Sequence, residues 1–279
     1  MALLALTLAL LAMTVATTAI EEKPLDMAPD SFDDQYQNCS HDMEDQLPAM
    51  NISDSQKNSL FAQVWVKAVA EWQRRGSPVP PLSSPAQAIA IMAYTMKDLY
   101  KEFNEEVRVA GRSPQEYRDN FHFKTLHFLL TDALATLGDA QKGKKCHSVF
   151  RGVKNILFKA KPGATIRFGQ FASSTLRENI IHKFGNTTVF KAQTCHGAYI
   201  QAFSYNTDEE EVLIPPFETF NVTKVIQHGE KVEIHLNSIG TYSKYNCEWL
   251  KGGSVPRAPG HLGGLLLATT ALAVATRIL

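Results

Sequence analysis

The hydrophobic pattern of this chain changes its period near Gly138, and this change restricts the possible folds more than any other feature. Before Gly138 apolar residues recur at helical spacing, whereas after it they form short runs rich in Val, Ile, Thr and aromatic residues. The predicted helices span residues 59–75, 85–95 and 121–137. The predicted strands span residues 147–153, 164–171, 187–194, 199–204, 211–214, 219–226 and 231–237. Helices followed by strands, without regular alternation, predict a single α+β domain in which N-terminal helices pack on an antiparallel-rich sheet core.

Short local signals mark where helices begin and end. Ser84 is followed by Pro85, which is the order of an N-cap residue and a proline at the first helical position. Ser113 and Glu116 have the spacing of a capping box. Gly76 ends the apolar pattern of the first predicted helix.

The first residues of the chain predict a signal peptide. The stretch from Ala2 to Ile20 is apolar and small, and Thr17-Thr18-Ala19 fits a cleavage site. Residues 1–19 would then be removed, and the folded domain would span residues 20–251. A membrane-spanning helix is the alternative, but the stretch is short and has no basic flank.

The C-terminal residues predict attachment of a lipid. Gly252, Gly253 and Ser254 are small, a spacer of Pro, Gly and Arg follows them, and residues 262–275 are apolar. This order is typical of a glycosylphosphatidylinositol (GPI) attachment signal, here over residues 252–279. The apolar run is shorter than the roughly 20 residues that span a bilayer. We therefore expect an extracellular protein held at the cell surface by a GPI anchor, with secretion as the alternative.

Entry into the secretory pathway makes the four cysteines candidates for two disulfides. They are Cys39, Cys146, Cys195 and Cys247, and their spacing alone allows three pairings. A zinc site is the competing interpretation, but no two cysteines are close in sequence and no histidine pair has the i, i+4 spacing of a zinc-binding helix. We therefore expect no metal site.

Export also gives meaning to the N-glycosylation sequons, which predict glycans at Asn51, Asn186 and Asn221. A fourth sequon, at Asn38, is discounted because its central residue is Cys39. The 28 basic and 28 acidic residues of the chain cancel. This balance argues against nucleic acid or an anionic membrane surface as the main partner.

An acidic cluster stands immediately before a predicted strand. Glu209 and Glu211 lie two residues apart, so at strand spacing they share one face, whereas Glu210 points to the other. Carboxylates held side by side repel each other, and they persist where a cation, a metal or a developing positive charge lies beside them. On its own, such a cluster is more often a solvated loop end. No Gly-x-Gly-x-x-Gly follows a strand, so a Rossmann mode of dinucleotide binding is not indicated.

Two motifs precede this cluster and change its interpretation. They are Val149-Phe150-Arg151-Gly152 and Arg167-Phe168-Gly169-Gln170-Phe171-Ala172-Ser173-Ser174-Thr175. An Arg, a Ser and a Glu-x-Glu, in this order and each beside a strand, resemble the vertebrate arginine-specific ecto-mono-ADP-ribosyltransferases. The resemblance covers residues 26–250 and includes Ser31-Phe32-Asp33-Asp34-Gln35-Tyr36, Phe123-Lys124-Thr125-Leu126-His127-Phe128-Leu129-Leu130 and Tyr245-Asn246-Cys247-Glu248. One position departs from the family pattern, because Thr175 carries an extra methyl group on the third hydroxyl of its run.

The resemblance implies a two-sheet ADP-ribosyltransferase core with helices packed on it. NAD would lie in a cleft between the sheets and be consumed as a substrate, so no permanently bound cofactor is expected. Arginine-bearing proteins would be the acceptors, and we expect a monomer. The disulfides that the resemblance implies are Cys39–Cys247 and Cys146–Cys195.

The resemblance also assigns residues to NAD. Arg151 would bind the pyrophosphate, because a planar, permanently charged fork holds phosphate oxygens in a fixed geometry. Gly152 would let the backbone approach the nicotinamide carboxamide. Ser173 would hydrogen-bond the nicotinamide-side ribose or Glu211. The other NAD contacts that the resemblance implies are Tyr94, Gln170 and Ser204. For the tyrosine, a place in the core is the alternative.

The two carboxylates would have different roles. Breaking the bond between nicotinamide and ribose builds positive charge on the sugar, and Glu211 would stabilise this oxocarbenium-like state. Glu209 would orient an acceptor arginine and accept its proton, because a guanidinium has no lone pair to offer. The chain is therefore predicted to transfer ADP-ribose from NAD to arginine. The alternatives are an NAD glycohydrolase and a catalytically idle surface glycoprotein. A retaining glycosidase is disfavoured because no second acid pair or aromatic platform is evident.

Overall fold

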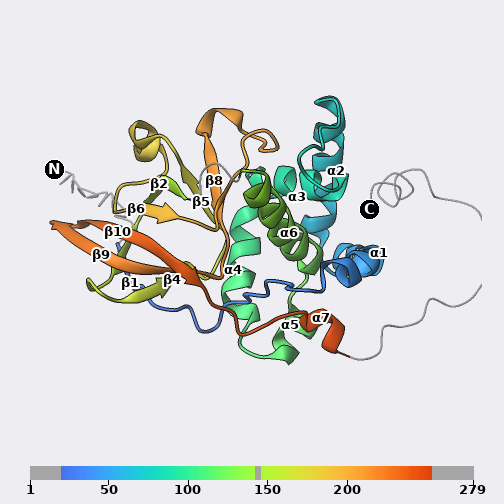
Figure 1. Ribbon diagram of the computed structural model, residues 1–279, viewed down its shortest axis with the longest axis horizontal. Coiled ribbons are helices and arrows are strands. Elements are labelled where there is room, and N and C mark those ends of the chain that lie inside the picture. The colour runs from blue at the N-terminus through green and yellow to red at the C-terminus, as the bar shows by residue number, and fades with distance from the viewer. Residues whose placement is uncertain (1–19, 142–145, 253–279) are drawn as a thin grey trace, which may run out of the picture.

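The computed structural model describes residues 20–141 and 146–252 of the chain (Figure 1). The predicted signal peptide, and all but the first residue of the predicted attachment signal, lie outside the described residues. Within the described part, no helix combines the length and the apolar character needed to cross a membrane.

Helices make up most of the first half of the domain. They are α1 (Ser40–Lys57), α2 (Ser59–Arg74), α3 (Pro85–Thr95), α4 (Tyr100–Ala110), α5 (Pro114–Asn120) and α6 (Lys124–Ala140), and a short α7 (Glu248–Lys251) follows the last strand. The three predicted helices correspond to α2, α3 and α6. Helix α1 escaped prediction because it turns polar residues toward the core: Asn51 and Asp54 are both buried, so its apolar pattern is weak.

Hydrogen bonds at the helix starts agree with the local sequence signals. Ser84 caps α3 by accepting a hydrogen bond from the backbone of Gln87, and Pro85 is the first helical residue. Ser113 caps α5 by accepting from the backbone of Glu116 at 3.0 Å. Each cap satisfies a backbone N–H that the helix itself leaves without a partner.

Strands make up the second half. They are β2 (His147–Val153), β3 (Ile156–Lys159), β4 (Thr165–Arg167), β5 (Ala172–Thr175), β6 (Thr188–Thr194), β7 (Ala198–Tyr199), β8 (Glu211–Ile214), β9 (Glu218–His228) and β10 (Lys231–Thr241), with β1 (Glu21–Pro24) at the N-terminus. Two short 3-10 helices, η1 (Glu178–Lys183) and η2 (Thr207–Glu209), lie between strands. Strand β1 pairs with β3, and the remaining strands form one sheet in the order β4-β9-β10-β6-β2-β5-β8-β7. In the larger sheet every described pair is antiparallel except β10 with β6.

Two predicted strands end early. The segment 164–171 is extended only over β4, because Gly169 adopts a positive φ of 63° and turns the chain. The segment 199–204 is a strand only at Tyr199; beyond it the backbone N–H of Ser204 bonds to the carbonyl of Ile200, as in a turn.

The larger sheet has a seam at its centre. Strands β2 and β5 share a single residue pair, Phe150 with Thr175, whereas β2 pairs with β6 over seven positions. The sheet therefore behaves as two sheets, one on each side of this contact, which agrees with the expected two-sheet core. Figure 1 shows the strands gathered on one side of the molecule and the helices on the other.

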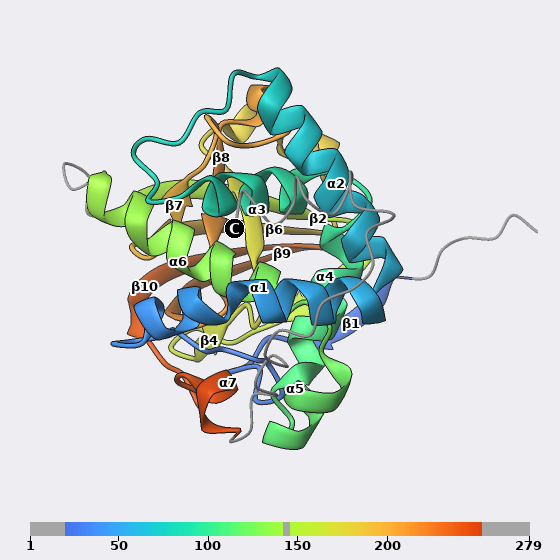
Figure 2. The ribbon, with the colours of Figure 1, turned by 90° about the vertical axis from the view of Figure 1, so that its right-hand side faces the viewer.

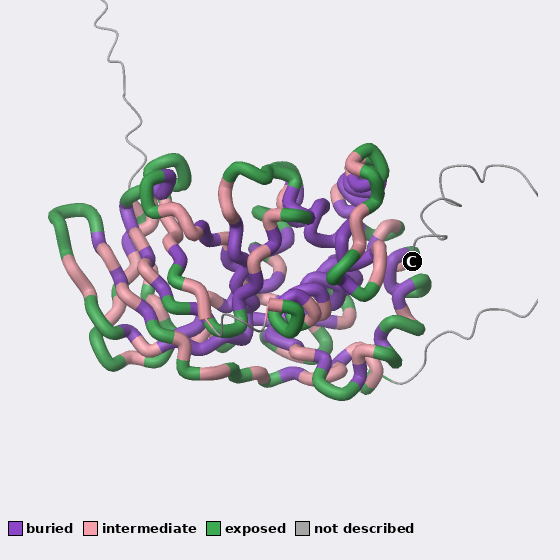
Figure 3. Tube along the Cα trace, turned by 45° about the horizontal axis from the view of Figure 1, so that its top comes forward, coloured by how far each residue is buried: buried purple, intermediate pink, exposed green. Residues whose placement is uncertain are grey.

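Two apolar clusters fill the domain. One lies among the helices and includes Leu213 from β8 and Phe171 just before β5, and the other lies within the sheet around Phe190 and Phe220. Figure 2 shows α1, α3 and α6 in front of the strands, and Figure 3 shows buried residues along the middle of the molecule.

A buried ion pair joins the N-terminal segment to the sheet. The side chains of Arg167 and Asp33 are both 0 % exposed, and Arg167 Nη1 lies 2.6 Å from Asp33 Oδ2. The same guanidinium also donates to the carbonyls of Met27, Ala28 and Tyr242. Because every charge here is paired and hydrogen-bonded, this arginine holds the start of the cleft-lining segment in place.

The structure contains two disulfides, with the pairings that the resemblance implies. Cys39 before α1 is bonded to Cys247 before α7, and Cys146 before β2 is bonded to Cys195 after β6. The second disulfide continues the antiparallel β2–β6 register by one residue. The first disulfide connects the two ends of the domain, and the second connects β2 to β6 at one end of this strand pair.

Removing either disulfide is expected to lower the free energy of unfolding. The linked cysteines are 208 and 49 residues apart, and loops of that size are worth about 4 to 5 kcal/mol each in the chain-entropy model. Urea unfolding of the Cys39→Ser/Cys247→Ser and Cys146→Ser/Cys195→Ser pairs should show losses of this size, with the larger loss for the first pair. Four free thiols in the intact mass of the unreduced protein would contradict both pairings.

Candidate active site

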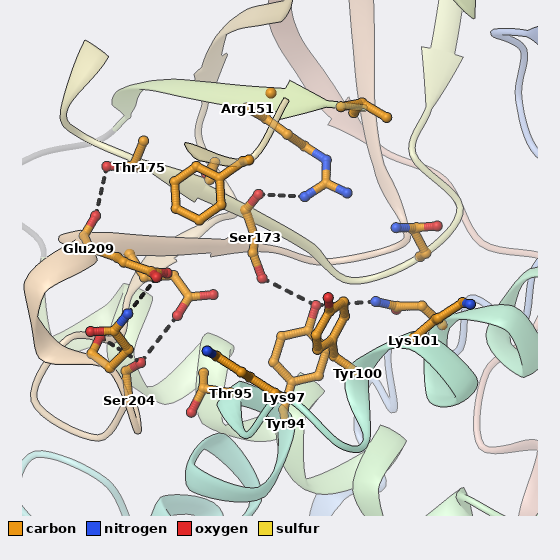
Figure 4. Close-up of a pocket in the computed structure, with 18 of the residues that line it drawn as sticks. Tyr94, Thr95, Lys97, Tyr100, Lys101, Arg151, Ser173, Thr175, Ser204 and Glu209 are labelled. Carbon is orange, nitrogen blue, oxygen red and sulfur yellow. Dashed lines mark hydrogen bonds between the residues drawn. The ribbon is translucent and has the colours of Figure 1, made fainter. Parts of the chain in front are cut away.

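A cleft of about 750 Å³ opens at the seam between β2 and β5. Its volume is within the usual range of small-molecule sites. All eight residues predicted for catalysis or NAD binding line it: Tyr94, Arg151, Gly152, Gln170, Ser173, Ser204, Glu209 and Glu211. In Figure 4, Arg151 and Ser173 enter the cleft between Glu209 and Ser204 on one side and Tyr100 and Lys101 on the other.

The seam itself brings Arg151 and Ser173 together. Arg151 follows Phe150, the last residue of β2 that pairs with β5, and Ser173 lies on β5. Beyond this pair the strands separate, and Arg151 Nη1 donates to the carbonyl oxygen of Ser173 at 2.6 Å. Burial lowers the pKa of the Arg151 guanidinium, yet arginine remains protonated in proteins. The cleft therefore holds a fixed cation of the kind that binds phosphate.

Gly152 lies in the cleft, but the structure requires a glycine there for another reason than expected. A Cβ atom at this position would overlap the carbonyl oxygens of Gly185 and Ile181. Glycine therefore allows the loop around η1 to pack directly on β2. The approach of its backbone to the nicotinamide carboxamide stays a prediction.

Glu211 is a buried carboxylate at the start of β8. It is 5 % exposed, and Ser204 Oγ donates to its Oε2 at 3.2 Å. Burial raises the pKa of Glu211 to about 7; a hydrogen bond from Ser173 opposes the rise, and the charge of Glu209 adds to it. A carboxylate removed from water in this way interacts strongly with any positive charge that develops beside it.

Glu209 lines the same cleft, but strand alternation does not place it there. Strand β8 begins only at Glu211, Glu209 ends the η2 turn, and Glu210 between them has a left-handed backbone with a φ of 45°. The prediction that a common strand face aligns the two carboxylates is therefore wrong. The turn is held by Thr175 Oγ1, which donates to the carbonyl of Glu209 at 2.6 Å, and by the amide of Asn206, which donates to the Glu209 carboxylate.

Glu210 does not line the cleft, as expected, but the cause is its left-handed backbone and not strand alternation. Its side chain is 41 % exposed, and its carboxylate lies 3.9 Å from the guanidinium of Arg177. The three successive glutamates are thus distinguished by position: one is buried in the cleft, one lies at its rim, and one faces away from it.

Tyr94 was expected either to contact NAD or to lie in the core, and its position is compatible with both. It is buried in α3 and also lines the cleft. Its hydroxyl donates to the carbonyl of Phe171 at 3.0 Å and lies 3.4 Å from Ser173 Oγ. Burial raises the pKa of Tyr94 to about 12, so the hydroxyl is protonated at neutral pH.

Sequence reasoning missed the side of the cleft that α4 forms. Helix α4 was not predicted, yet it contributes Tyr100, Lys101, Asn104 and Arg108 to the lining. Three of these recur every four residues, which places them on one face of a helix. Helix α4 also carries an apolar repeat of Phe103, Val107 and Ala110 on its buried face, and this repeat was a detectable signal. Phe184, 38 % exposed beyond η1, also lines the cleft.

One predicted glycosylation site conflicts with the structure. Asn51 lies inside α1, is 7 % exposed, and has a buried Nδ2 atom. A glycan on this atom would have to displace the helix from the core, so the prediction for Asn51 is wrong for this fold. Asn186 is exposed and Asn221 is half-buried, and for both the glycan stays a prediction.

The comparison with known proteins agrees with the geometry. The sequence profile of the family described as NAD:arginine ADP-ribosyltransferase matches residues 25–244. The chain is 42 % identical to GPI-linked NAD(P)(+)-arginine ADP-ribosyltransferase 1 of Oryctolagus cuniculus, over 93 % of this chain and 84 % of that protein. It is 46 % identical to an erythroblast NAD(P)(+)-arginine ADP-ribosyltransferase of Gallus gallus, over 90 % of this chain and 86 % of the relative.

Solved structures show the same fold. The crystal structure of the eucaryotic mono-ADP-ribosyltransferase ART2.2 superposes with a TM-score of 0.70 at 35 % identity, covering 80 % of this chain and 98 % of that one. A mutant of ART2.2 in complex with NAD superposes with a TM-score of 0.68 at 34 % identity, with the same coverage.

Proposed function

The chain belongs to the NAD:arginine ADP-ribosyltransferase family, and on this premise we propose how its cleft transfers ADP-ribose from NAD to arginine side chains of proteins. NAD is a substrate of this enzyme. One observation carries the assignment of roles: the buried carboxylate of Glu211 opens into the same cleft as the Arg151 guanidinium and a second carboxylate, Glu209. A cation suits the pyrophosphate, and the two acids suit the two positive centres of the reaction.

In the first half of the reaction the bond between nicotinamide and the ribose C1 breaks. The bonding electrons leave with neutral nicotinamide, and positive charge develops on the ribose. Glu211 stabilises this charge more than it stabilises bound NAD, because the positive charge on the sugar is largest in the transition state. Ser204 holds the carboxylate in place by a hydrogen bond from its hydroxyl.

In the second half a guanidinium nitrogen of the acceptor forms the new bond to C1. The nitrogen must lose a proton as it attacks, and Glu209 at the rim accepts that proton. The products are nicotinamide, ADP-ribosylated arginine and one released proton. Hydrolysis, in which water replaces the guanidine, is the competing outcome, and a carboxylate at position 209 favours transfer over hydrolysis.

The direct test is to incubate the purified protein with labelled NAD and a small guanidino acceptor. Labelled acceptor and free nicotinamide are measured together. We expect nicotinamide release to be matched largely by transfer. Release without transfer would identify an NAD glycohydrolase, and neither product would identify an idle glycoprotein.

The reaction is expected to slow in acid. The pKa of Glu211 is raised to about 7, chiefly by burial, and only its ionised form stabilises the ribose cation. Below the pKa, kcat/KM for NAD should fall about tenfold for each unit of pH, because kcat/KM reports ionisations of the free enzyme. Initial rates at several values of pH check this. A flat profile from pH 7 down to about pH 5 would show that Glu211 ionises at ordinary acid pH or is not required.

The enzyme is placed at the extracellular face of the cell surface by a lipid anchor. Relatives such as that of Oryctolagus cuniculus are described as GPI-linked. We propose that residues 252–279 are exchanged for the anchor, that residues 20–251 form the mature domain, and that this domain acts as a monomer. Light scattering of the released protein tests the monomer.

Phosphatidylinositol-specific phospholipase is expected to release the protein from intact cells, because the anchor would be its only attachment to the membrane. Flow cytometry before and after treatment measures the loss from the surface. Recovery of the peptide 262–279 in the mature chain would rule the anchor out.

A further inference from the structure

Helix α4 places a buried amide against the segment that carries Gln170 and Ser173. The Asn104 side chain is part of this buried contact, with the residue 5 % exposed. Its Oδ1 accepts from the backbone N–H of Phe171 at 3.1 Å, and its Nδ2 donates to the Tyr94 hydroxyl at 3.2 Å. Phe171 is the neighbour of Gln170 and lies two residues before Ser173. The Asn104 amide therefore contacts the backbone between Gln170 and Ser173, where it can fix the direction of both side chains.

These contacts form a closed ring with a single consistent direction. The Phe171 carbonyl can only accept, so the Tyr94 hydroxyl must donate its proton there, at 3.0 Å. The hydroxyl oxygen is then free to accept, and Asn104 supplies the donor. Asn104 also supplies the acceptor for the Phe171 N–H, so both polar groups of this residue are satisfied without water. A side chain with an acceptor on both arms cannot complete the ring.

The ring has a consequence for Ser173. Because the proton of Tyr94 is committed to Phe171, it is not offered to Ser173 Oγ, which lies 3.4 Å away. The contact between the two hydroxyls therefore requires Ser173 Oγ to donate its proton to the Tyr94 oxygen. On the opposite side, Arg151 holds the Ser173 carbonyl at 2.6 Å. The serine is thus fixed from α3 and α4 on one side and from β2 on the other.

The next turn of α4 supports the same segment. Arg108 lies four residues after Asn104, on the same face of the helix, and its guanidinium donates to the side-chain oxygen of Gln170. The aromatic ring of Phe103 packs on Phe171 with a centroid distance of 5.5 Å. Helix α4 thereby holds the cleft-lining Gln170 and the buried Phe171 that follows it.

We propose that Asn104 is a positioning residue for NAD: by holding Tyr94 and Phe171 it sets the orientation of Gln170 and Ser173 toward the dinucleotide. The residue does not itself react. The proposal rests on the proposed function for the identity of the ligand, and its test therefore uses binding as well as turnover.

The test is a double-mutant cycle on dinucleotide binding. NADH serves as the probe, because its uncharged nicotinamide ring is not a leaving group, and calorimetry on the purified protein gives its Kd. Asn104→Asp preserves size but replaces the donor to Tyr94 with an acceptor. It is expected to raise the Kd about tenfold, and Tyr94→Phe is expected to raise it by a similar factor. The double variant should bind no more weakly than the weaker single variant.

This coupling separates positioning from simple support of the fold. Asn104→Asp introduces its negative charge both in the protein with Tyr94 and in the Tyr94→Phe variant. The direct effect of the charge on the Kd therefore cancels when the two changes in Kd are compared. A residue that only stabilises the fold would lower the thermal midpoint without changing the Kd well below that temperature. Asn120→Asp is the matched control, since this exposed asparagine does not line the cleft and its side-chain amide donates to Glu116 in α5. The control should leave the Kd unchanged. Asn104→Ser, which carries no charge, gives the same comparison if Asn104→Asp does not fold.

Two results would overturn the proposal. One is a Kd for Asn104→Asp within about twofold of the unsubstituted protein, and the other is single-variant effects that simply multiply in the double variant. An unsubstituted protein that binds NADH but transfers nothing to arginine would refute the proposed function, while the Kd series would still decide the role of Asn104. An unsubstituted protein that does not bind NADH would refute both.

Discussion

Glu211→Gln should reduce NAD cleavage and transfer to arginine together, by about a hundredfold or more, which corresponds to roughly 3 kcal/mol of transition-state stabilisation. Glutamine keeps the size of the side chain and can still accept a hydrogen bond from Ser204. It removes only the negative charge that faces the ribose. The effect should therefore appear in kcat more than in the KM for NAD, and initial rates over a range of NAD concentrations separate the two.

Glu210→Gln is the matched control for this substitution. It removes a carboxylate one residue away that lies outside the cleft, so its activity should equal that of the unsubstituted enzyme. The Glu211 variant should also lose the acid limb of its pH profile, because the titrating group is gone. Undiminished transfer in Glu211→Gln would exclude this glutamate from the mechanism.

Glu209→Gln should abolish transfer to arginine and leave much of the NAD hydrolysis. The substitution does not change the carboxylate that faces the ribose, so cleavage of the nicotinamide bond can continue. Water needs less help than a protonated guanidinium to act as the acceptor, because it has a lone pair available without prior loss of a proton. Labelled acceptor and free nicotinamide, measured in the same reaction, give the ratio of the two activities.

The ratio is the decisive quantity, since a general loss of activity could follow from a distorted turn. The backbone contact of Glu209 with Thr175 does not involve the substituted carboxylate, so the η2 turn should persist. The variant should thus behave as a glycohydrolase. Equal loss of both activities would show that the two carboxylates do not divide the reaction as proposed.

The fold could be predicted from the sequence where apolar periodicity reflects burial. Strands β2 and β8 have the bounds predicted for them, and α3 begins and ends where its cap and pattern indicate. Prediction failed where backbone conformation or polar contacts decide the structure. A positive φ at Gly169 ends one strand early, and the buried polar residues of α1 hid that helix. Helix α4 was overlooked although its buried residues Phe103, Val107 and Ala110 recur at helical spacing.

The cleft shows a similar division. Its eight predicted residues were assigned through the family resemblance, and all of them line it. Periodicity gave the wrong reason for two carboxylates to meet, because the left-handed backbone of Glu210 lies between them. It also could not reveal the role of Asn104, since the hydrogen bonds of this buried amide include one to Phe171, which is distant in sequence. Partners of this kind are visible only after the chain has folded.

The disulfide between Cys39 and Cys247 makes most of the domain a covalent ring. A protease outside the cell that cuts this ring once, for example at the exposed hairpin tip around Gly229, releases no fragment. The two pieces stay joined by the disulfide and by the pairing of β9 with β10. Nicked enzyme would therefore retain its mass and run as one band until a reductant is added, so damage to the chain and loss of the protein from the surface become separate events.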